Sequence, residues 1–262
     1  MSGLSQCHRI VVKIGSSTLT HEEGHLNLRR IEALVKTLSD FKNAGCQVVL
    51  VSSGAVAAGV AKMGGKRPAN TREKQAMAAV GQSELMRLYS RFFADFGHTV
   101  GQILMTRDVI DQPERRTAVE DTFATLLEMG CVPIVNENDS VSVEGLKFGD
   151  NDTLSAYVAL VCHADLLINL SDVDGLYDGD PRHNADAKLI PVVRGIDESL
   201  LAIAGGAGSG KGTGGMSTKL EAARIALGAG IPMFILNGKD PTVLYDLLEG
   251  KPLGTYFAPA EH

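Results

Sequence analysis

The chain has 262 residues, of which 44% are hydrophobic and 21% are charged, a composition typical of a soluble globular protein with a sizeable core. The formal net charge of −6 offers no basic surface for nucleic acid, no apolar run is long enough to span a membrane, and no secretion signal opens the chain. We therefore expect a cytoplasmic protein without nucleic-acid or membrane partners, whose four cysteines, lacking any Cys-x-x-Cys spacing, are idle thiols.

Short apolar runs alternate with longer amphipathic segments along the whole chain. The predicted strands are Arg9–Lys13, Gln47–Ser52, Val100–Met105, Val132–Asn136, Leu166–Leu170 and Pro232–Leu236. The predicted helices are Leu28–Asn43, Lys74–Phe96, Thr117–Met129, Asn151–Val161 and Ser217–Ala229. Runs of Val, Ile and Leu indicate strands buried on both faces of a parallel sheet. The sequence thus predicts a single α/β domain, residues 1–262, with an open, mainly parallel sheet sandwiched between helix layers.

Residues 141–149 interrupt this alternation. Apolar and polar residues alternate there around Glu144 and Gly145, which predicts a β-hairpin.

Ligands of open α/β sheets bind beyond the carboxyl ends of the strands, so the loops at those ends are the candidate sites. Lys13–Ser17 follows the first strand, and its small residues leave backbone N–H groups free to face an anion. Ser52–Gly59 follows the second strand, and Gly54 lets the chain turn into a helix that begins with small residues. Tight packing of that helix explains this loop as well as binding does, and Ser53 suits both roles.

The most polar loops follow the strand that ends at Asn136. Residues 136–139 close that strand, and residues 149–152 open the next helix. Helix capping accounts for one of the three polar residues 150–152 but not for all of them. The acidic residues of the two segments are Glu137, Asp139, Asp150 and Asp152. These carboxylates would repel one another unless a cation lies among them, which could be a metal, a lysine or a substrate ammonium group.

Two further segments, Ser171–Tyr177 and Gly212–Lys219, are rich in small and polar residues. Gly205–Lys211 nearly fits a P-loop, but Gly212 takes the place of the required Ser or Thr, and the preceding Ser199–Ala204 looks helical rather than extended. We reject a P-loop and expect residues 205–215 to form a mobile flap or a plain flexible loop.

Several stretches, in the same order along the chain, resemble the amino-acid kinase family and, within it, the glutamate 5-kinases. They are Lys13–Ser17, Ser53–Ala55, Gln75–Gln82, Asn136–Val141, Gly149–Asp152, Asp174–Tyr177 and Gly212–Lys219. The resemblance implies an amino-acid-binding lobe at residues 1–165 and a nucleotide-binding lobe at residues 166–262. Many bacterial members carry a further C-terminal domain of the kind found in RNA-modifying enzymes. Because the chain ends shortly after Phe257, we expect that domain and any RNA contact to be absent.

The resemblance also implies roles for single residues. Lys13 and Lys219 match two lysines that contact the transferring phosphoryl group, and Asp152 matches the aspartate that orients them. The implied amino-acid-binding positions are Ser53, Gly54, Asn136, Asp139 and Asn151. The implied nucleotide-binding positions are Lys13, Ser171, Asp172, Thr213, Gly214, Gly215, Met216, Ser217, Thr218 and Lys219. Family members use magnesium, carried mainly by the ATP phosphates, so no protein ligand of the metal is expected.

These residue types suit transfer of a phosphoryl group to a carboxylate. A glutamate side chain has an ordinary pKa near ~4.3 and is already ionised at neutral pH, so the reaction needs no general base. The obstacle is repulsion between two anions, which lysines and magnesium offset. We expect Asp139 to pair with the α-ammonium group of free glutamate, and the amides of Asn138 and Asn151 to meet its carboxylates. An N-acetylated substrate has no such charge to satisfy.

The resemblance implies a kinase that makes L-glutamyl 5-phosphate from ATP and L-glutamate, in the first step of proline biosynthesis. It further implies L-proline as a feedback inhibitor, a homo-oligomer, and a neighbouring reductase that consumes the labile product. Alternatives are an N-acetylglutamate, aspartate or nucleoside-monophosphate kinase of the same family, or a non-catalytic amino-acid sensor, although retention of both lysines and Asp152 argues against a sensor. A nicotinamide-dependent dehydrogenase is disfavoured because no G-x-G-x-x-G motif follows the first strand.

Overall fold

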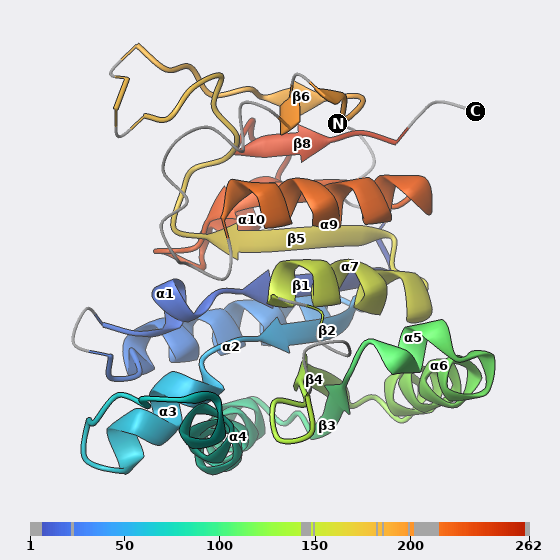
Figure 1. The fold of residues 1–262 in the computed structure, drawn as a ribbon. Coiled ribbons are helices and arrows are strands. Elements are labelled where there is room, and N and C mark those ends of the chain that lie inside the picture. The colour runs from blue at the N-terminus through green and yellow to red at the C-terminus, as the bar shows by residue number, and fades with distance from the viewer. Residues whose placement is uncertain are drawn as a thin grey trace.

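The computed structural model describes residues 7–21, 24–142, 148, 150–181, 183–184, 186–198, 200–201 and 215–259. Within these residues the chain forms an eight-stranded sheet in the order β3-β4-β2-β1-β5-β7-β8-β6 (Figure 1). The strands are β1 Arg9–Ile14, β2 Gln47–Ser52, β3 Val100–Met105, β4 Val132–Glu137, β5 Leu166–Ser171, β6 Val192–Val193, β7 Met233–Asn237 and β8 Thr255–Phe257.

All neighbouring strands from β3 to β7 run parallel, and β8 is antiparallel to β7. The prediction of an open, mainly parallel sheet is confirmed, and each predicted strand is present with ends that differ by at most one residue. The short strands β6 and β8 were not predicted. The sheet is continuous through the β1–β5 pair, across the expected lobe boundary after residue 165. The division into two binding lobes stays a prediction.

Helices cover both faces of this sheet (Figure 1). They are α1 Ser16–Leu19, α2 Leu28–Asn43, α3 Ala55–Lys62, α4 Thr71–Asp95, α5 Asp108–Asp111, α6 Pro113–Glu128, α7 Asn151–Val161, α9 Met216–Gly228 and α10 Val243–Leu248. The five predicted helices are present, but α4 and α6 begin earlier than expected. The side chain of Asn70 caps α4 by accepting a hydrogen bond from Glu73 N at 2.9 Å. Helix α6 begins at Pro113, because proline is well suited to the first helical position.

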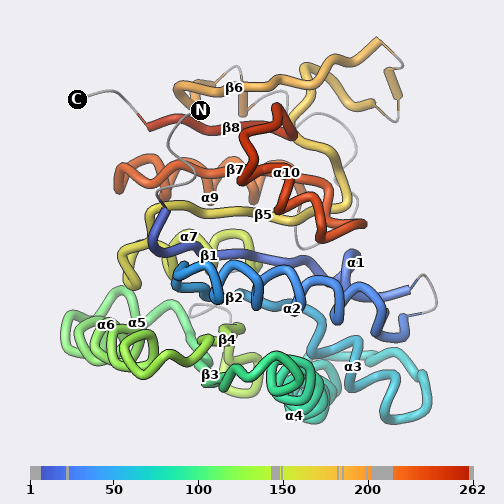
Figure 2. The backbone as a smooth tube through the Cα atoms, turned by 180° about the vertical axis from the view of Figure 1, so that it is seen from behind, coloured from blue at the N-terminus to red at the C-terminus, as the bar shows by residue number. Residues whose placement is uncertain are grey.

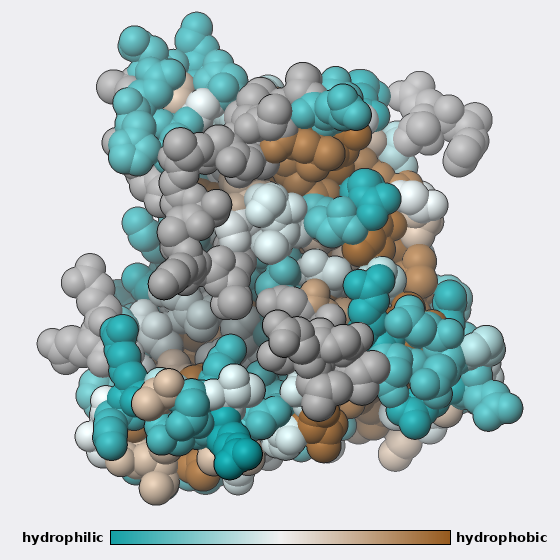
Figure 3. All heavy atoms as spheres, viewed as in Figure 1, coloured by the Kyte–Doolittle hydropathy of each residue, from teal (hydrophilic) through white to brown (hydrophobic). Residues whose placement is uncertain are grey.

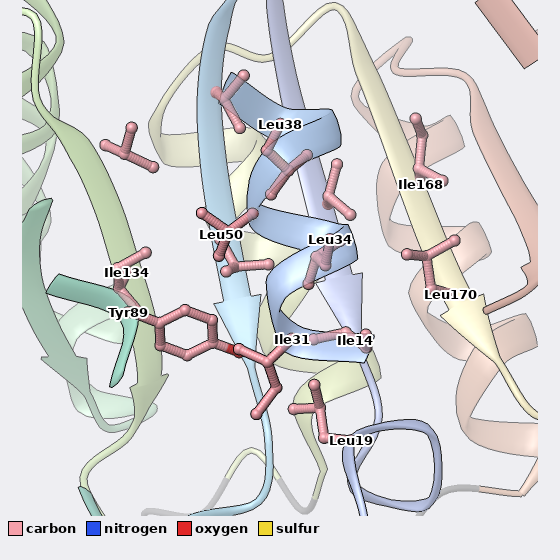
Figure 4. Close-up of a cluster of buried hydrophobic side chains, with 14 of the residues drawn as sticks. Ile14, Leu19, Ile31, Leu34, Leu38, Leu50, Tyr89, Ile134, Ile168 and Leu170 are labelled. Carbon is pink, nitrogen blue, oxygen red and sulfur yellow. The ribbon is translucent and has the colours of Figure 1, made fainter. Parts of the chain in front are cut away.

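The buried strands divide the core into two parts, one on each face of the sheet. In β1, Ile10, Val12 and Ile14 point to the face covered by α2, α4 and α10, which is seen in Figure 2. Val11 points to the opposite face, toward the helices α6, α7 and α9. Figure 4 shows Leu34 of α2 packed over the first of these faces. Successive side chains of a strand point to opposite faces of the sheet. Lys13, two residues after Val11, therefore points to the face that α7 and α9 cover.

Hydrophilic side chains gather over α5 and α6 on the face shown in Figure 3, whereas apolar surface lies near β8. No helix of the described part of the chain is both long and apolar enough to cross a membrane. The predicted hairpin at 141–149 falls mostly outside the described residues, as does the predicted flap at 205–215 apart from Gly215.

Candidate active site

The carboxyl ends of the parallel strands meet along one edge of the sheet, where helices α3, α7 and α9 begin. Backbone hydrogen bonds tie the turns at this edge together: Ser53 N donates to Ile14 O at 3.1 Å, and Gly238 N donates to Ser171 O at 2.7 Å. The first amides of α7 and α9 carry partial positive charge because they lack partners within their own helices. This edge is therefore suited to anionic ligands.

Asp152, in the first turn of α7, is fully buried and lies at the centre of the site. Its Oδ1 accepts hydrogen bonds from Lys13 Nζ and from Asn169 Nδ2, the latter at 2.7 Å. Its Oδ2 accepts from Lys219 Nζ at 3.0 Å and from Thr218 Oγ1 at 2.8 Å. The structure thus brings the three predicted catalytic residues, which come from β1, α7 and α9, into direct contact.

The strand register explains why these groups converge. Lys13 and Asn169 are direct partners in the β1–β5 pair, and both side chains lie on the face covered by α7. Each is almost fully buried, so an ammonium and an amide group lie beneath the first turn of α7. Since α9 packs beside α7, its first turn brings Lys219 to the same carboxylate.

The buried cluster holds the carboxylate of Asp152 between the ammonium groups of Lys13 and Lys219. Burial alone would raise the pKa of Asp152, but Lys13 and Lys219 outweigh burial and hold this pKa well below its usual range. Burial lowers the pKa of Lys13, and repulsion from Lys219 acts in the same direction against the attraction of Asp152. Two ammonium groups therefore share the Asp152 carboxylate.

On the other side of α7, an amide network joins three predicted amino-acid-binding residues. Asn151 Nδ2 lies 2.8 Å from Ser53 Oγ, 2.8 Å from Asn136 Oδ1 and 3.3 Å from Ser52 O. The adjacent Gly54 has φ of 100°, a conformation that favours glycine at the turn into α3. The structure therefore brings Ser53, Asn136 and Asn151 together, with Gly54 beside them.

Two other acidic residues of this region accept hydrogen bonds from nearby backbone and hydroxyl groups. Asp150 caps α7 by accepting from Thr153 N at 2.9 Å, and burial raises its pKa. Glu137 Oε1 accepts from Ser142 Oγ and Phe148 N, each at 3.1 Å.

Asp139 lies half-buried on the turn after β4. For Asp152, the cations are Lys13 and Lys219, one of the three possibilities that the sequence left open. The described residues contain no group of three His, Cys, Asp or Glu side chains placed to hold a metal ion.

The predicted nucleotide-binding residues lie mainly at the carboxyl end of β5 and at the start of α9. Ser171 Oγ donates to Asp172 Oδ1 at 3.2 Å, and Gly215 precedes the first turn of α9, which contains Met216 and Ser217. Two members of that first turn, Thr218 and Lys219, contact Asp152 directly. Thr213 and Gly214 lie outside the described residues.

Two residues of the site, Asn169 and Gln82, were not predicted from the sequence. Asn169 is the one amide in the apolar run of β5, and its place opposite Lys13 follows from the strand pairing. Gln82 lies within a stretch that carries the family resemblance, but no role was predicted for it. Gln82 Oε1 accepts a hydrogen bond from Asn136 Nδ2 at 2.9 Å.

Residues 8–237 match the sequence profile of the amino acid kinase family. The chain belongs to this family. It is 52% identical over 259 residues to the glutamate 5-kinase of Clostridium perfringens (strain 13 / Type A), covering 97% of this chain and 96% of that protein. It is 50% identical to the glutamate 5-kinase of Listeria monocytogenes serovar 1/2a, covering 97% and 94% of the two chains. A further glutamate 5-kinase, from Carboxydothermus hydrogenoformans, is also 50% identical, over 98% of this chain and 69% of that protein. Within the amino acid kinase family, the chain thus groups with the glutamate 5-kinases.

Solved structures of more distant proteins share the fold. T. acidophilum isopentenyl phosphate kinase superposes with a TM-score of 0.64 at 18% identity, covering 95% of this chain and 99% of that chain. UMP kinase from Bacillus anthracis superposes with a TM-score of 0.65 at 16% identity, covering 97% of each chain. These similarities show the fold and leave the acceptor substrate to be argued from the site.

Proposed function

We propose that this protein transfers the γ-phosphoryl group of ATP to the side-chain carboxylate of L-glutamate, making L-glutamyl 5-phosphate in the first step of proline biosynthesis. The observation that carries the proposal is the buried Lys13–Asp152–Lys219 cluster, which lies between the amide network and the nucleotide-binding residues predicted on β5 and α9. The close similarity to proteins called glutamate 5-kinase supports the choice of acceptor.

The cluster provides positive charge where phosphoryl transfer needs it. Lys13 and Lys219 contact the transferring group and stabilise negative charge on its oxygens, while ionised Asp152 keeps both ammonium groups in place. Because these groups are buried, their attraction for an anion is weakly screened by solvent. Catalysis then consists of positioning and electrostatic stabilisation, and no side chain needs to accept a proton.

On the acceptor side, Asp139 pairs with the α-ammonium group of glutamate. The orientation of Asn151 argues against the expectation that its amide group meets the carboxylates of glutamate. Its Nδ2 carries two hydrogens and already has three acceptors within reach, so this group is occupied and cannot meet a carboxylate. The remaining atom, Oδ1, is an acceptor and suits the ammonium group. Ser53, Gly54 and Asn136 complete this subsite.

On the nucleotide side, the proposal places ATP against Ser171, Asp172 and residues 213–219. Magnesium bound to the ATP phosphates would supply further charge neutralisation; the described residues offer it no ligand cluster of their own. Residues 1–165 thus form the amino-acid lobe and residues 166–262 the nucleotide lobe. The proposal also includes cytoplasmic location, a homo-oligomer, inhibition by L-proline and a reductase that consumes the acyl phosphate.

The test is to incubate purified protein with ATP, magnesium, L-glutamate and hydroxylamine. Formation of γ-glutamyl hydroxamate with stoichiometric ADP release is the expected result. A panel containing N-acetylglutamate, aspartate and UMP distinguishes the other kinases of this family. ADP release with one of these and none with glutamate would overturn the acceptor, and binding of glutamate without any ADP release would favour a sensor.

A further inference from the structure

Helix α4 presents three polar side chains to the acceptor side at seven-residue intervals: Gln75, Gln82 and Tyr89. Seven residues are close to two helical turns, so these side chains share one face of α4. Their partners are, in the same order, Ser142 O at 3.0 Å, Asn136 Nδ2 at 2.9 Å and Ser52 Oγ at 2.7 Å. Figure 4 shows the phenol oxygen of Tyr89 pointing toward the end of β2. One helix face thus contacts the end of β2, the end of β4 and the turn after β4.

The amide of Asn136 has only one satisfactory orientation. Its Oδ1 accepts from Glu137 N at 2.9 Å and from Asn151 Nδ2 at 2.8 Å. A rotation by 180° would place Asn136 Nδ2 against both of these donors and leave two hydrogen bonds unmade. Asn136 Nδ2 must therefore point toward α4, where Gln82 Oε1 accepts its hydrogen. Because Asn136 is buried, that donor would have no alternative partner without Gln82 among the contacts of the described residues.

The backbone of α4 is fixed against the loop that carries Ser53. A Cβ atom on Gly81 would lie 1.7 Å from Ala55 O, and one on Gly59 would lie 1.9 Å from Met77 O. Helices α3 and α4 therefore touch backbone to backbone, and α3 begins directly after the Ser53–Gly54 turn. This contact holds the residue next to Gly81, which is Gln82, at a set distance from the acceptor loop.

The contacts form a closed circuit. From Ser53 the chain enters α3, α3 is packed on α4, Gln82 of α4 accepts from Asn136 of β4, and Asn136 accepts from Asn151 of α7. Asn151 then donates back to Ser53 Oγ at 2.8 Å. Helices α3, α4 and α7 and strand β4 are thereby held in one arrangement, and Gln82 is the member of the circuit that no part of the proposed function uses.

We propose that Gln82 is a positioning residue for the amino-acid acceptor. It accepts the hydrogen of Asn136 and so holds the Asn136 and Asn151 amides in the orientation that leaves Asn151 Oδ1 available to the substrate ammonium group. Gln82 acts through Asn136. The inference rests on the proposed function, since it assumes that the acceptor lies on this amide network.

The test compares Gln82→Met, which keeps the side-chain length and removes the accepted hydrogen bond, with the wild-type protein. We expect the KM for glutamate to rise about fivefold or more, the fold change that one lost neutral hydrogen bond predicts, and the KM for ATP to stay within about twofold. Gln102→Met on the exposed edge of β3 is the matched control and should leave both constants unchanged. Equal changes in both KM values for Gln82→Met, or no change, would overturn the inference.

A double-mutant cycle with Asn136→Ala separates action through Asn136 from an independent contact. In the Asn136→Ala background, Gln82→Met should add less than about twofold to the KM for glutamate. Full additivity would show that Gln82 acts by another route. Thermal melts of every variant verify folding, and the single variant still decides the question if Asn136→Ala fails to fold. If wild-type protein does not phosphorylate glutamate, the proposed function fails; if it does and Gln82→Met behaves like the wild type, only this inference fails.

Discussion

At the scale of single residues, the buried lysines are the groups whose removal has the clearest expected effect. Lys219→Met should lower kcat at least ~100-fold, because a donor aimed at charge that develops in the transition state is typically worth roughly 3 kcal/mol. The variant keeps one lysine beside Asp152, so it should remain folded. Lys36→Met, an exposed change on α2, is the control and should leave kcat unchanged. A near-normal kcat for Lys219→Met would exclude this lysine from the mechanism.

Asp139 offers a separate test of how the acceptor is recognised. Asp139→Ala should raise the KM for glutamate about 10- to 100-fold, since a hydrogen bond to a charged group contributes about 1.5–3 kcal/mol. The KM for ATP should change little, because ATP is expected to bind on the other side of the Asp152 cluster. Equal effects on the two substrates would indicate that Asp139 maintains the shape of the site. Initial-rate kinetics with each substrate varied in turn gives both values.

Asp152 couples the site to the stability of the whole fold through its lowered pKa. A carboxylate whose pKa is lowered by folding contributes stability above its unfolded pKa of about 3.9, and this contribution is lost as the pH falls toward the folded pKa. Asp152→Asn should therefore cost most at neutral pH, where it removes the carboxylate that both buried ammonium groups contact. Between pH 7 and pH 3 the cost should shrink by about 1 kcal/mol, as the unfolded wild-type chain begins to bind the proton.

Urea unfolding of both proteins across this pH range measures the effect. Asp121→Asn, on the exposed side of α6, controls for the loss of one negative charge. A difference in unfolding free energy that is the same at pH 7 and pH 3 would contradict an ionised, lysine-paired Asp152.

At the scale of elements, the close contact of α3 with α4 depends on glycine. Gly81→Ala would place a methyl group 1.7 Å from a backbone oxygen of α3, so the helices must separate. We expect a loss of at least ~2 kcal/mol in the free energy of unfolding, at the upper part of the usual range for overpacking. Gly228→Ala, in α9, meets nothing within 4 Å and should be neutral or stabilising by up to ~1 kcal/mol. Similar stability of the two variants in urea unfolding would show that the backbone contact is not needed.

The sequence predicted the elements that have strong local signals. The six long strands are continuous apolar runs, and α2 and α7 follow polar residues that cap them, so their positions were predicted closely. The strands β6 and β8 have two and three residues, too few for any periodicity. Strand β8 pairs on the edge of β7, and β6 pairs in turn with β8. Such pairing between distant parts of the chain has no signature within a short segment.

The site residues also divide into those with a local sequence signal and those whose role depends on distant parts of the chain. Lys13 lies near the end of β1, and Asp152 and Lys219 lie near the starts of α7 and α9, beside loops of unusual composition, and the family resemblance named all three. Asn169 and Gln82 lie inside a strand and a helix, where one polar residue has many ordinary explanations. Their roles depend on which face of the element meets the site, and this follows only from strand register and helix packing.

At the scale of the whole molecule, the continuous sheet carries two predicted subsites that meet at one carboxylate. The acceptor side is built from the ends of β2 and β4, and the nucleotide side from the end of β5 and the start of α9. Asp152, at the start of α7, contacts Lys13 on β1 and Lys219 on α9. A ligand confined to one side should therefore leave binding on the other side largely intact.

This arrangement predicts how L-proline should inhibit. Proline keeps an α-carboxylate beside a cationic nitrogen, so it suits the same contacts as glutamate at Asp139 and Asn151 Oδ1. It lacks the γ-carboxylate and offers nothing to the phosphoryl group, so its complex is a dead end. We expect inhibition that is competitive with glutamate and not competitive with ATP, and Asp139→Ala should weaken proline and glutamate in parallel because both depend on one charge-assisted contact. Initial rates at several concentrations of each substrate test this. The shared-site explanation fails if millimolar proline has no effect, or if saturating glutamate does not relieve the inhibition.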